Sequence, residues 1–348
     1  MMKRIGIVIL AITLMISTVS CKNNEQEKYE ASFLILFDTV TKFVAYADSK
    51  EDFEVFAQSI HDDLEQYHQL FDKYNSYDGI NNIKTINDNA GIAPVKVDQR
   101  IIDLLLFSKE MEQKTDGMVN IALGSVLEIW HNYRTEGTED PDNATLPPME
   151  DLVEANAHTD INNMIIDEAN STVYLSDARM SLDVGAIAKG YATEQVTQNA
   201  IAKGNMDFLL SVGGNVRASG NKGAAKEPWS VGIQNPNKDS EQNSLYTLAL
   251  TDMSLVASGV YERFYTVDGK QYHHIIDPNT LMPATYFSAV SIVCKDSGLA
   301  DALSTAVFNM PYEDGKSLIE SFDNIEALWV FSDGAMKYSD HFKEFIKE

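Results

Sequence analysis

Strand-like and helix-like patterns follow one another in an irregular order along this chain of 348 residues. Apolar, β-branched runs predict strands over residues 33–37 and 41–46. Apolar residues at helical spacing then predict helices over 53–74 and 100–115. Short strands separated by Gly and Asn are expected from 208 to 274. Because strands and helices do not alternate regularly, the order favours an α+β fold of mixed sheets with flanking helices over a doubly wound parallel sheet.

The remaining segments fit the same class. Strands are expected over 171–175 and 180–182, a helix over 298–309, and a helix followed by two strands over 314–338. No fixed-period repeat occurs, which argues against a solenoid or propeller. A chain of this length allows one large domain or two moderate ones. We expect a single domain over residues 29–348.

The N-terminus has the pattern of a secretory signal over residues 1–20. Lys3 and Arg4 precede an apolar run from Ile5 to Ile16, which is short for a membrane span. The run ends in Thr18-Val-Ser-Cys21, and small residues before a cysteine resemble a bacterial lipobox. We therefore expect Cys21 to be the lipidated mature N-terminus, residues 21–28 to be a tether, and the domain to lie outside the cytoplasm on a bacterial membrane.

The formal net charge of −25 argues against a nucleic-acid surface and against charge-driven docking on anionic lipid. Any anion that this protein binds must therefore be held by local groups, such as a metal ion, a helix terminus or a single lysine. The second of the two cysteines, Cys294, lies in a strand-like apolar run and is expected to be a small buried hydrophobe.

An acid, small residues and a lysine meet at a predicted strand-to-helix junction, Asp183-Val-Gly-Ala-Ile-Ala-Lys-Gly190. Gly185 and Gly190 allow close backbone approach, and backbone N–H groups at a helix start attract anions. Lys189 adds a positive charge. The junction could therefore hold a phosphate, although Gly- and Ala-rich turns of this kind also serve plain packing.

Asp301 and Thr305 lie four residues apart on a predicted helix, so a carboxylate and a hydroxyl share one face. Hard oxygen ligands of this kind suit Mg²⁺, which also binds water and substrate phosphates. The alternative is a helix start in which Asp301 interacts favourably with the helix dipole and Thr305 bonds to its own backbone.

Two adjacent histidines occur in Tyr272-His-His-Ile-Ile-Asp277-Pro278, at the end of a predicted strand. Strand alternation places His274 on one face with Ile276, so we expect His274 to be the more buried of the pair. It could act as a general base or be a hydrogen-bonded core residue. The chain has no Gly-x-Gly-x-x-Gly, no Walker-type loop and no Gly-x-Ser-x-Gly, so neither a Rossmann unit nor a hydrolase elbow is supported.

Taken together and in order, several motifs resemble the ApbE family of FAD:protein FMN transferases. The matching segments are Phe71-Asp-Lys-Tyr74 with Ile86-Asn87, Thr115-Asp-Gly-Met-Val-Asn-Ile121 leading to Trp130, Ser181-Leu-Asp-Val-Gly-Ala-Ile-Ala-Lys-Gly-Tyr191, Val212-Gly-Gly-Asn-Val-Arg217, Pro228-Trp-Ser-Val-Gly-Ile233, Ala257-Ser-Gly259, His274-Ile-Ile-Asp-Pro278 and Ala300-Asp-Ala-Leu-Ser-Thr305. They cover the chain from about residue 31 onward.

The resemblance implies one domain with FAD in a cleft between two subregions, and Mg²⁺-dependent transfer of FMN from FAD to a threonine hydroxyl with release of AMP. The acceptor would be a flavin-carrying redox protein that is exported or membrane-bound. By the same resemblance, the Ala186 carbonyl, Asp301 and Thr305 would hold Mg²⁺. The implied FAD contacts are Asp183, Lys189, Tyr77, Val119, Asn120, Ile121 and His274. His274 would also be a candidate base, and Asp301 is grouped with it as catalytic.

The chain departs from the family pattern at two positions. Leu281 stands where the family often has glycine, and Asn120 stands where many members have aspartate. Two other activities remain compatible with the same motifs. One is an FAD pyrophosphatase that forms FMN and AMP, and the other is an FAD-binding lipoprotein without turnover.

Overall fold

The computed structural model describes residues 26–261 and 263–347; the predicted signal segment and Cys21 lie outside these residues. Its main feature is an eight-stranded sheet with the order β1-β2-β6-β7-β10-β13-β14-β15, in which every neighbouring pair is antiparallel. Three small sheets, β3-β5-β4, β8-β9 and β11-β12, complete the fold. The mixed helices and sheets confirm the predicted α+β class.

The strands are β1 (Glu27–Leu34), β2 (Val40–Ala47), β3 (Val95–Lys96), β4 (Met164–Asp167), β5 (Thr172–Leu175), β6 (Phe208–Val212), β7 (Asn215–Ser219), β8 (Trp229–Gln234), β9 (Ser244–Leu250), β10 (Met253–Gly259), β11 (Phe264–Val267), β12 (Lys270–His273), β13 (Ala289–Cys294), β14 (Glu326–Val330) and β15 (Met336–Tyr338).

The α-helices are α1 (Lys50–Phe71), α2 (Ile83–Asp88), α3 (Gln99–Lys114), α4 (Gly124–Glu139), α5 (Met149–Asn156), α6 (Ala188–Ala202), α7 (Ser297–Phe308) and α8 (Tyr312–Glu320). Four 3₁₀ turns, η1 (Leu36–Asp38), η2 (Pro141–Asn143), η3 (Ile161–Asn163) and η4 (Phe342–Phe345), join or end these elements. In the described part of the chain, no helix is long and apolar enough to cross a membrane.

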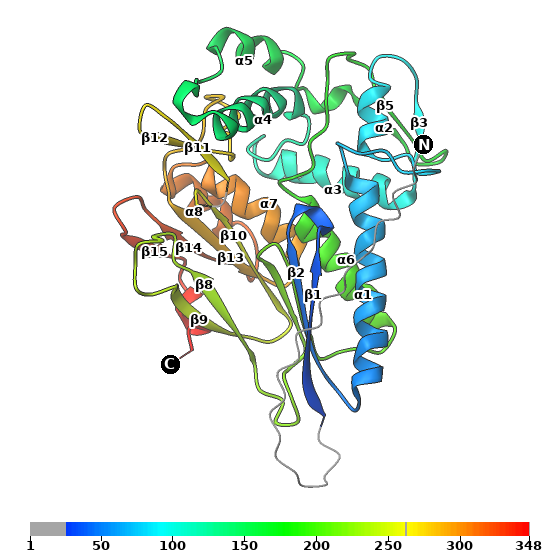
Figure 1. Ribbon diagram of the computed structural model, residues 1–348, viewed down its shortest axis with the longest axis vertical. Coiled ribbons are helices and arrows are strands. Elements are labelled where there is room, and N and C mark those ends of the chain that lie inside the picture. The colour runs from blue at the N-terminus through cyan, green and yellow to red at the C-terminus, as the bar shows by residue number, and fades with distance from the viewer. Residues whose placement is uncertain (1–25, 262, 348) are drawn as a thin grey trace.

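Helices cover one face of the large sheet and the β8–β9 hairpin covers part of the other (Figure 1). The strands show why both faces need cover. In β2, Phe43 packs on the helix side and the next residue, Val44, packs on the β8–β9 side. All six residues of β13 are buried, as expected of a central strand with an apolar run.

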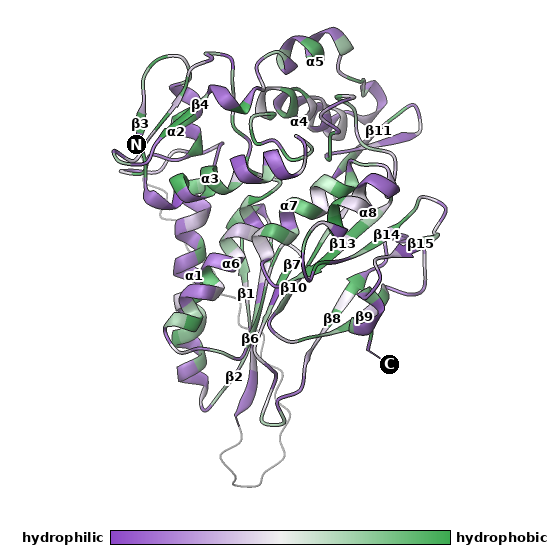
Figure 2. Ribbon diagram, turned by 180° about the vertical axis from the view of Figure 1, so that it is seen from behind, coloured by the Kyte–Doolittle hydropathy of each residue, from purple (hydrophilic) through white to green (hydrophobic). Residues whose placement is uncertain are grey.

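Helix α1 begins where the Ser49 side chain accepts a hydrogen bond from the Asp52 backbone N–H at 3.1 Å. Its buried residues, among them Phe53, Ile60 and Leu64, recur at helical spacing. Figure 2 shows the result as alternating hydrophilic and hydrophobic segments along α1. The helix predicted over 53–74 is thus confirmed, with ends a few residues earlier.

A second part of the molecule lies above one end of the large sheet and contains α2 to α5, β3 to β5 and β11–β12 (Figure 1). A separate apolar cluster joins α4, α5 and β11, with Trp130, Leu152 and Tyr265 among its buried members. The buried residues of α2, α3 and β3 to β5 belong instead to the cluster that also contains α1 and β2. The candidate site lies between this part and the part formed by the large sheet, α6 and α7.

Three sequence predictions are corrected here. Only the first two residues of the predicted strand 33–37 belong to a strand, because β1 ends at Leu34 and a tight turn follows, with positive φ at Ile35 and Phe37. Strand β1 begins at Glu27, so the last two residues of the predicted tether belong to the sheet. Within 180–182, only Ser181 pairs, through a single bridge to Leu123.

Candidate active site

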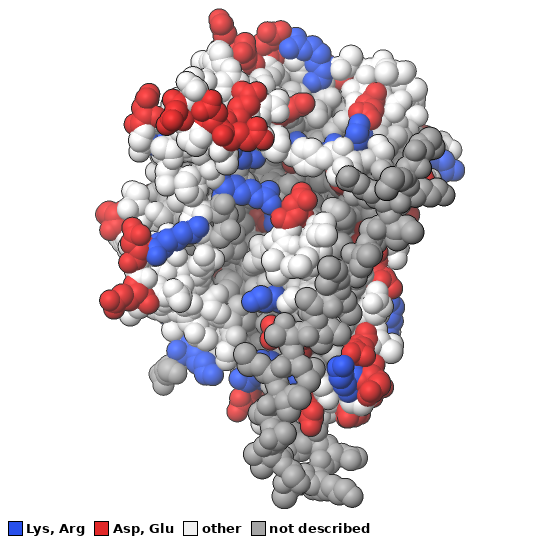
Figure 3. All heavy atoms as spheres, viewed as in Figure 1, with Lys and Arg blue, Asp and Glu red and all other residues white. Residues whose placement is uncertain are grey.

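A cleft of about 370 Å³ opens between the two parts of the molecule. One side is formed by β7, β10, α6 and α7, and the other by α4 and the turn before it. The loop after α1 and the turn η1 form the rim. Figure 3 shows this face hollowed below α4, with Lys and Arg side chains near the hollow. The cleft between two subregions that the family resemblance implies is therefore present.

Asp301 reaches the cleft from the first turns of α7 and is only 5% exposed. Its Oδ2 accepts hydrogen bonds from the Gly190 backbone N–H at 2.8 Å and from Asn215 Nδ2 at 2.9 Å. Among the described residues, no donor bonds Oδ1 and no Lys or Arg forms an ion pair with this carboxylate. Burial raises the pKa of Asp301, and the nearby Lys189 and the two donors oppose that rise.

Other oxygen donors lie on the same face of α7 or across from it. Thr305 follows Asp301 by one turn and Asn309 follows Thr305 by another, and both line the cleft. Asn309 Oδ1 is buried and has no hydrogen-bond partner among the described residues. Ala186 also lines the cleft, just before α6. The structure thus brings together the three predicted metal ligands, Ala186, Asp301 and Thr305.

Asp183 is held in an ion pair rather than left free. Its Oδ2 lies 2.7 Å from Lys73 Nζ, and its Oδ1 accepts a hydrogen bond from the Gly185 backbone N–H at 2.9 Å. Burial acts to raise the pKa of Asp183, but Lys73 and the Gly185 N–H outweigh it, and the net shift is downward. The carboxylate therefore stays ionised and its lone pairs are partly engaged before any ligand binds.

Basic side chains gather around the cleft of this acidic protein. Lys189, Arg134 and Arg263 line it, in addition to the paired Lys73. Lys189 Nζ lies 3.3 Å from the Gly185 carbonyl oxygen, and Arg134 Nη2 lies 3.1 Å from His131 Nδ1. Among the described residues, none of these three has a carboxylate partner within ion-pair distance. The cleft is therefore suited to an anionic ligand.

His274 lines the cleft, whereas its neighbour His273 is the more buried of the two, contrary to the prediction. Strand β12 ends at His273, so strand alternation does not continue through His274. His273 Nε2 lies 2.7 Å from the Ala284 carbonyl oxygen, and its ring packs edge-on against Phe308.

His274 Nδ1 lies 3.3 Å from the Arg263 carbonyl oxygen. Burial first, then Arg263 and Arg134, lower the pKa of His274 to about 3, so its ring is neutral at pH 7.

The remaining predicted FAD contacts divide into two groups. Val119 and Asn120 line the cleft. Tyr77 and Ile121 do not: the Tyr77 hydroxyl donates to Asp72 at 2.7 Å, and the buried Ile121 accepts the Asp183 backbone N–H through its carbonyl at 2.7 Å. Tyr77 therefore supports the lining residue Asp72, and Ile121 supports the lining residue Asp183.

The two departures from the family pattern have a structural reason here. Asn120 accepts from the Ala122 N–H through Oδ1 and donates from Nδ2 to the Thr159 carbonyl, which an aspartate could not do. Leu281 has φ +60°, a left-handed conformation that glycine adopts without strain. Its side chain is buried against α4, and its carbonyl accepts from Trp130 Nε1 at 2.8 Å.

Sequence reasoning gave no role to Lys73, Asn215, Arg134 and Arg263, which all line the cleft. Lys73 and Asn215 lie inside the motifs Phe71-Asp-Lys-Tyr74 and Val212-Gly-Gly-Asn-Val-Arg217, so the family resemblance could have identified both as site residues. Arg134 and Arg263 carried no spacing signal, because only the fold brings them together.

Known proteins share the sequence pattern and the fold of this chain. The ApbE family model matches residues 37–329. The chain belongs to the ApbE family. A Treponema pallidum (strain Nichols) protein named FAD:protein FMN transferase is 36% identical over 270 residues, which cover 74% of this chain and 72% of that protein. A Klebsiella pneumoniae (strain 342) protein of the same name is 30% identical over 267 residues, which cover 75% of this chain and 80% of that protein.

Solved structures agree with the ApbE assignment. The crystal structure of the ApbE protein from Thermotoga maritima superposes with a TM-score of 0.79 at 31% identity, covering 92% of this chain and all of that one. The flavin transferase ApbE from Vibrio cholerae has a TM-score of 0.75 at 22% identity and supports the fold alone.

Proposed function

We propose that this protein is an FAD:protein FMN transferase that joins FMN to a threonine hydroxyl of an acceptor protein and releases AMP. The observation that carries the proposal is a family-type cleft in which a buried carboxylate, Asp301, faces basic side chains. FAD is a dianionic pyrophosphate with two flat ring systems, and it fits a cleft that combines cations with apolar walls. The relatives' shared name supports this activity.

The residues present fit a magnesium ion. One oxygen of the buried Asp301 carboxylate has no donor among the described residues, and Thr305 and Ala186 line the same cleft. Such a hard oxygen set suits Mg²⁺, which also takes water and phosphate oxygens. When bound, the ion would neutralise charge on the pyrophosphate and on the departing AMP.

The transfer would exchange one phosphorus–oxygen bond for another. The threonine oxygen forms a bond to the FMN phosphorus, and the bond from that phosphorus to the bridging oxygen breaks. The bridging oxygen keeps the electron pair and leaves as part of AMP. Lys189 and Arg134 would hold phosphate oxygens in place, because positioning and electrostatics supply most of the acceleration in phosphoryl transfer.

His274 would take the proton of the threonine hydroxyl. Because Nδ1 faces the Arg263 carbonyl, we assign the ring proton to Nδ1, which leaves Nε2 as the acceptor. A low pKa makes a weak base, but the charge of bound FAD would raise the pKa of His274 toward neutrality. The free protein thus holds the histidine neutral, and the substrate increases its basicity.

We also propose that the domain works outside the cytoplasm, anchored through a lipid on Cys21. The proposal depends on the sequence pattern Thr18-Val-Ser-Cys21 after the apolar run. Labelled palmitate incorporated by wild type but not by Cys21→Ala would support it. Equal labelling of both would overturn it.

The activity is tested by incubating the purified protein with FAD, Mg²⁺ and an acceptor that carries the target threonine. Covalent flavin should appear as in-gel fluorescence on the acceptor, and a Thr→Ala acceptor should stay dark. AMP and free FMN formed without acceptor would favour the pyrophosphatase. FAD recovered unchanged would favour a binding protein.

A further inference from the structure

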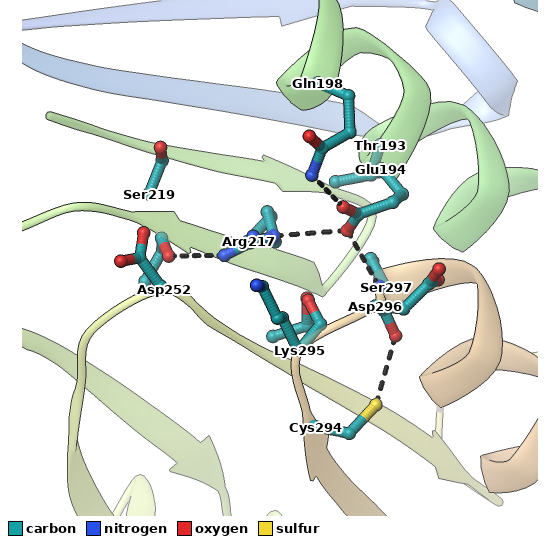
Figure 4. Close-up of polar contacts among 12 residues, drawn as sticks. Thr193, Glu194, Gln198, Arg217, Ser219, Asp252, Cys294, Lys295, Asp296 and Ser297 are labelled. Atoms are coloured by element: carbon teal, nitrogen blue, oxygen red, sulfur yellow. Dashed lines mark hydrogen bonds and ion pairs between the residues drawn. The ribbon is translucent and has the colours of Figure 1, made fainter. Parts of the chain in front are cut away.

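Helices α6 and α7 and strand β7 meet behind the cleft through two layers of polar contacts. The cleft layer consists of Asp301, the Gly190 N–H and Asn215. In the inner layer, the Glu194 Oε2 accepts the Ser297 backbone N–H at 3.0 Å and pairs with Arg217 Nε at 3.1 Å. Figure 4 shows this carboxylate between α6, the strand of Arg217 and the start of α7.

The two layers keep the same spacing on all three elements. Their members are four residues apart in α6 and in α7, and two residues apart in β7. Four helical residues rise about 6 Å, and two strand residues rise about 6.6 Å. Each element therefore contributes to both layers at nearly equal separation, so a shift in the inner layer moves the cleft layer.

Helices α6 and α7 touch so closely that no side-chain atom fits at Gly190. A Cβ on Gly190 would lie 2.3 Å from the Ser297 carbonyl oxygen and 2.4 Å from the Asp301 Cβ. The backbone of α6 thus touches the same turn of α7 that carries Asp301. The angle and position of α7 set where the free Oδ1 of Asp301 points.

The two charged side chains of the inner layer are buried and hydrogen-bonded. Arg217 is 1% exposed and also donates from Nη1 to the Ala218 carbonyl at 2.7 Å. Glu194 is 5% exposed and accepts from Gln198 Nε2 at 2.6 Å through its other oxygen. Apolar residues of similar volume often give equal or greater stability than a buried ion pair. Stability alone therefore does not explain two buried charges here.

We propose that Glu194 and Arg217 are positioning residues: they fix the start of α7 against α6 and β7 and thereby aim Asp301 at the metal-binding position. The link to the metal rests on the proposed function, whereas the coupling between the two layers does not. Neither side chain lines the cleft, so neither is expected to touch FAD.

The test compares Glu194→Gln with the double variant Glu194→Met, Arg217→Met in the full-length protein. Mg²⁺ alone is titrated calorimetrically, the melting temperature is measured, and hydrogen exchange is followed at the Gly190 amide. We expect Glu194→Gln to weaken Mg²⁺ binding about 10-fold, as loss of a residue that orients a ligand commonly does. Glu194→Gln breaks the buried ion pair and should also lower the melting temperature. The double variant should restore the wild-type melting temperature but not the Mg²⁺ affinity, and its Gly190 amide should exchange faster than that of wild type.

Phe342→Leu is the matched control, because it removes volume from a fully buried site in the cluster on the other face of the sheet. It should lower the melting temperature without changing Mg²⁺ affinity or Gly190 exchange. If Glu194→Gln yields no folded protein, Arg217→Lys, which keeps the charge but loses the guanidinium geometry, replaces it. A double variant with Mg²⁺ affinity within about twofold of wild type and unchanged Gly190 exchange would overturn the proposal. Should wild type bind no Mg²⁺, the metal assignment fails and the exchange measurement alone decides the coupling.

Discussion

One oxygen of Asp301 accepts two hydrogen bonds and the other accepts none from the described residues, which is the arrangement expected of a metal-binding carboxylate. Asp301→Asn keeps an oxygen that can accept from the Gly190 N–H and Asn215 but removes the charge. We expect transfer of FMN to fall by about 100-fold or more with the melting temperature little changed. Initial rates at saturating Mg²⁺ measure this, and wild-type rates in the variant would refute the role of Asp301.

His274 makes stability depend on pH in a defined direction. Its pKa falls from 6.5 in the unfolded chain to about 3 in the folded one, so the unfolded state binds more protons between those values. The stability that the neutral ring contributes is therefore complete above pH 6.5 and is lost as the pH falls toward 3. Urea unfolding of wild type and His274→Asn at pH 7 and pH 4.5 should show the smaller loss in the variant. An equal loss in both proteins would contradict the assignment.

Leu281 combines a strained backbone with a buried side chain. Leu281→Gly relieves about 1 kcal/mol of left-handed strain but removes a buried leucine, whose loss costs about 2–5 kcal/mol. The lost burial outweighs the relief, so we expect the variant to be about 2 kcal/mol less stable. Denaturant titration gives the value, and a variant as stable as wild type would show that the leucine contributes little packing.

At the scale of elements, the contact between α6 and α7 is the most sensitive point of the site. Gly190→Ala would place a methyl group 2.3 Å from the Ser297 carbonyl oxygen, so the helices must separate. We expect lower stability and weaker Mg²⁺ binding together. Gly232→Ala is the control, since its new methyl group meets only the end of the Ser244 side chain, at 3.2 Å. Equal behaviour of the two variants would argue against a tight contact at Gly190.

The spacing of apolar residues predicted those helices and strands in which buried positions recur regularly. The helices α1, α3 and α7 and the short strands after residue 208 follow apolar spacing, and each was found within a few residues. The strand predicted over 33–37 is right only for Phe33 and Leu34, because the apolar residues after them belong to a turn with positive φ, in which Ile35 remains exposed. Apolar character alone does not distinguish such a turn from a strand.

The site was predictable only where one element carries it. The Asp301 and Thr305 pair lies on one helix, so spacing revealed it. The donors to Asp301 come from α6 and β7, more than eighty residues away in sequence, and no local pattern encodes that convergence. The relative burial of His273 and His274 was predicted wrongly because strand β12 ends at His273.

For the whole molecule, a large surplus of acidic residues contrasts with a cleft lined by Lys189, Arg134 and Arg263, which have no carboxylate partner among the described residues. The part with the large sheet, α6 and α7 contributes Asp301 and Thr305, which we propose as metal ligands, and α4 with the loop before β11 contributes Arg134 and Arg263. An anionic substrate between the two parts would therefore contact both. This arrangement explains how a protein with net charge −25 can bind FAD.

The central claim is transfer of FMN to a protein, and intact-mass spectrometry of the acceptor tests it most directly. The acceptor is incubated with FAD, Mg²⁺ and either wild type or Asp301→Asn, and released AMP is quantified in the same samples. Our account predicts one added FMN per acceptor with wild type, an equal amount of AMP, and neither with the variant. An unmodified acceptor in the presence of wild type, with or without AMP, would contradict it.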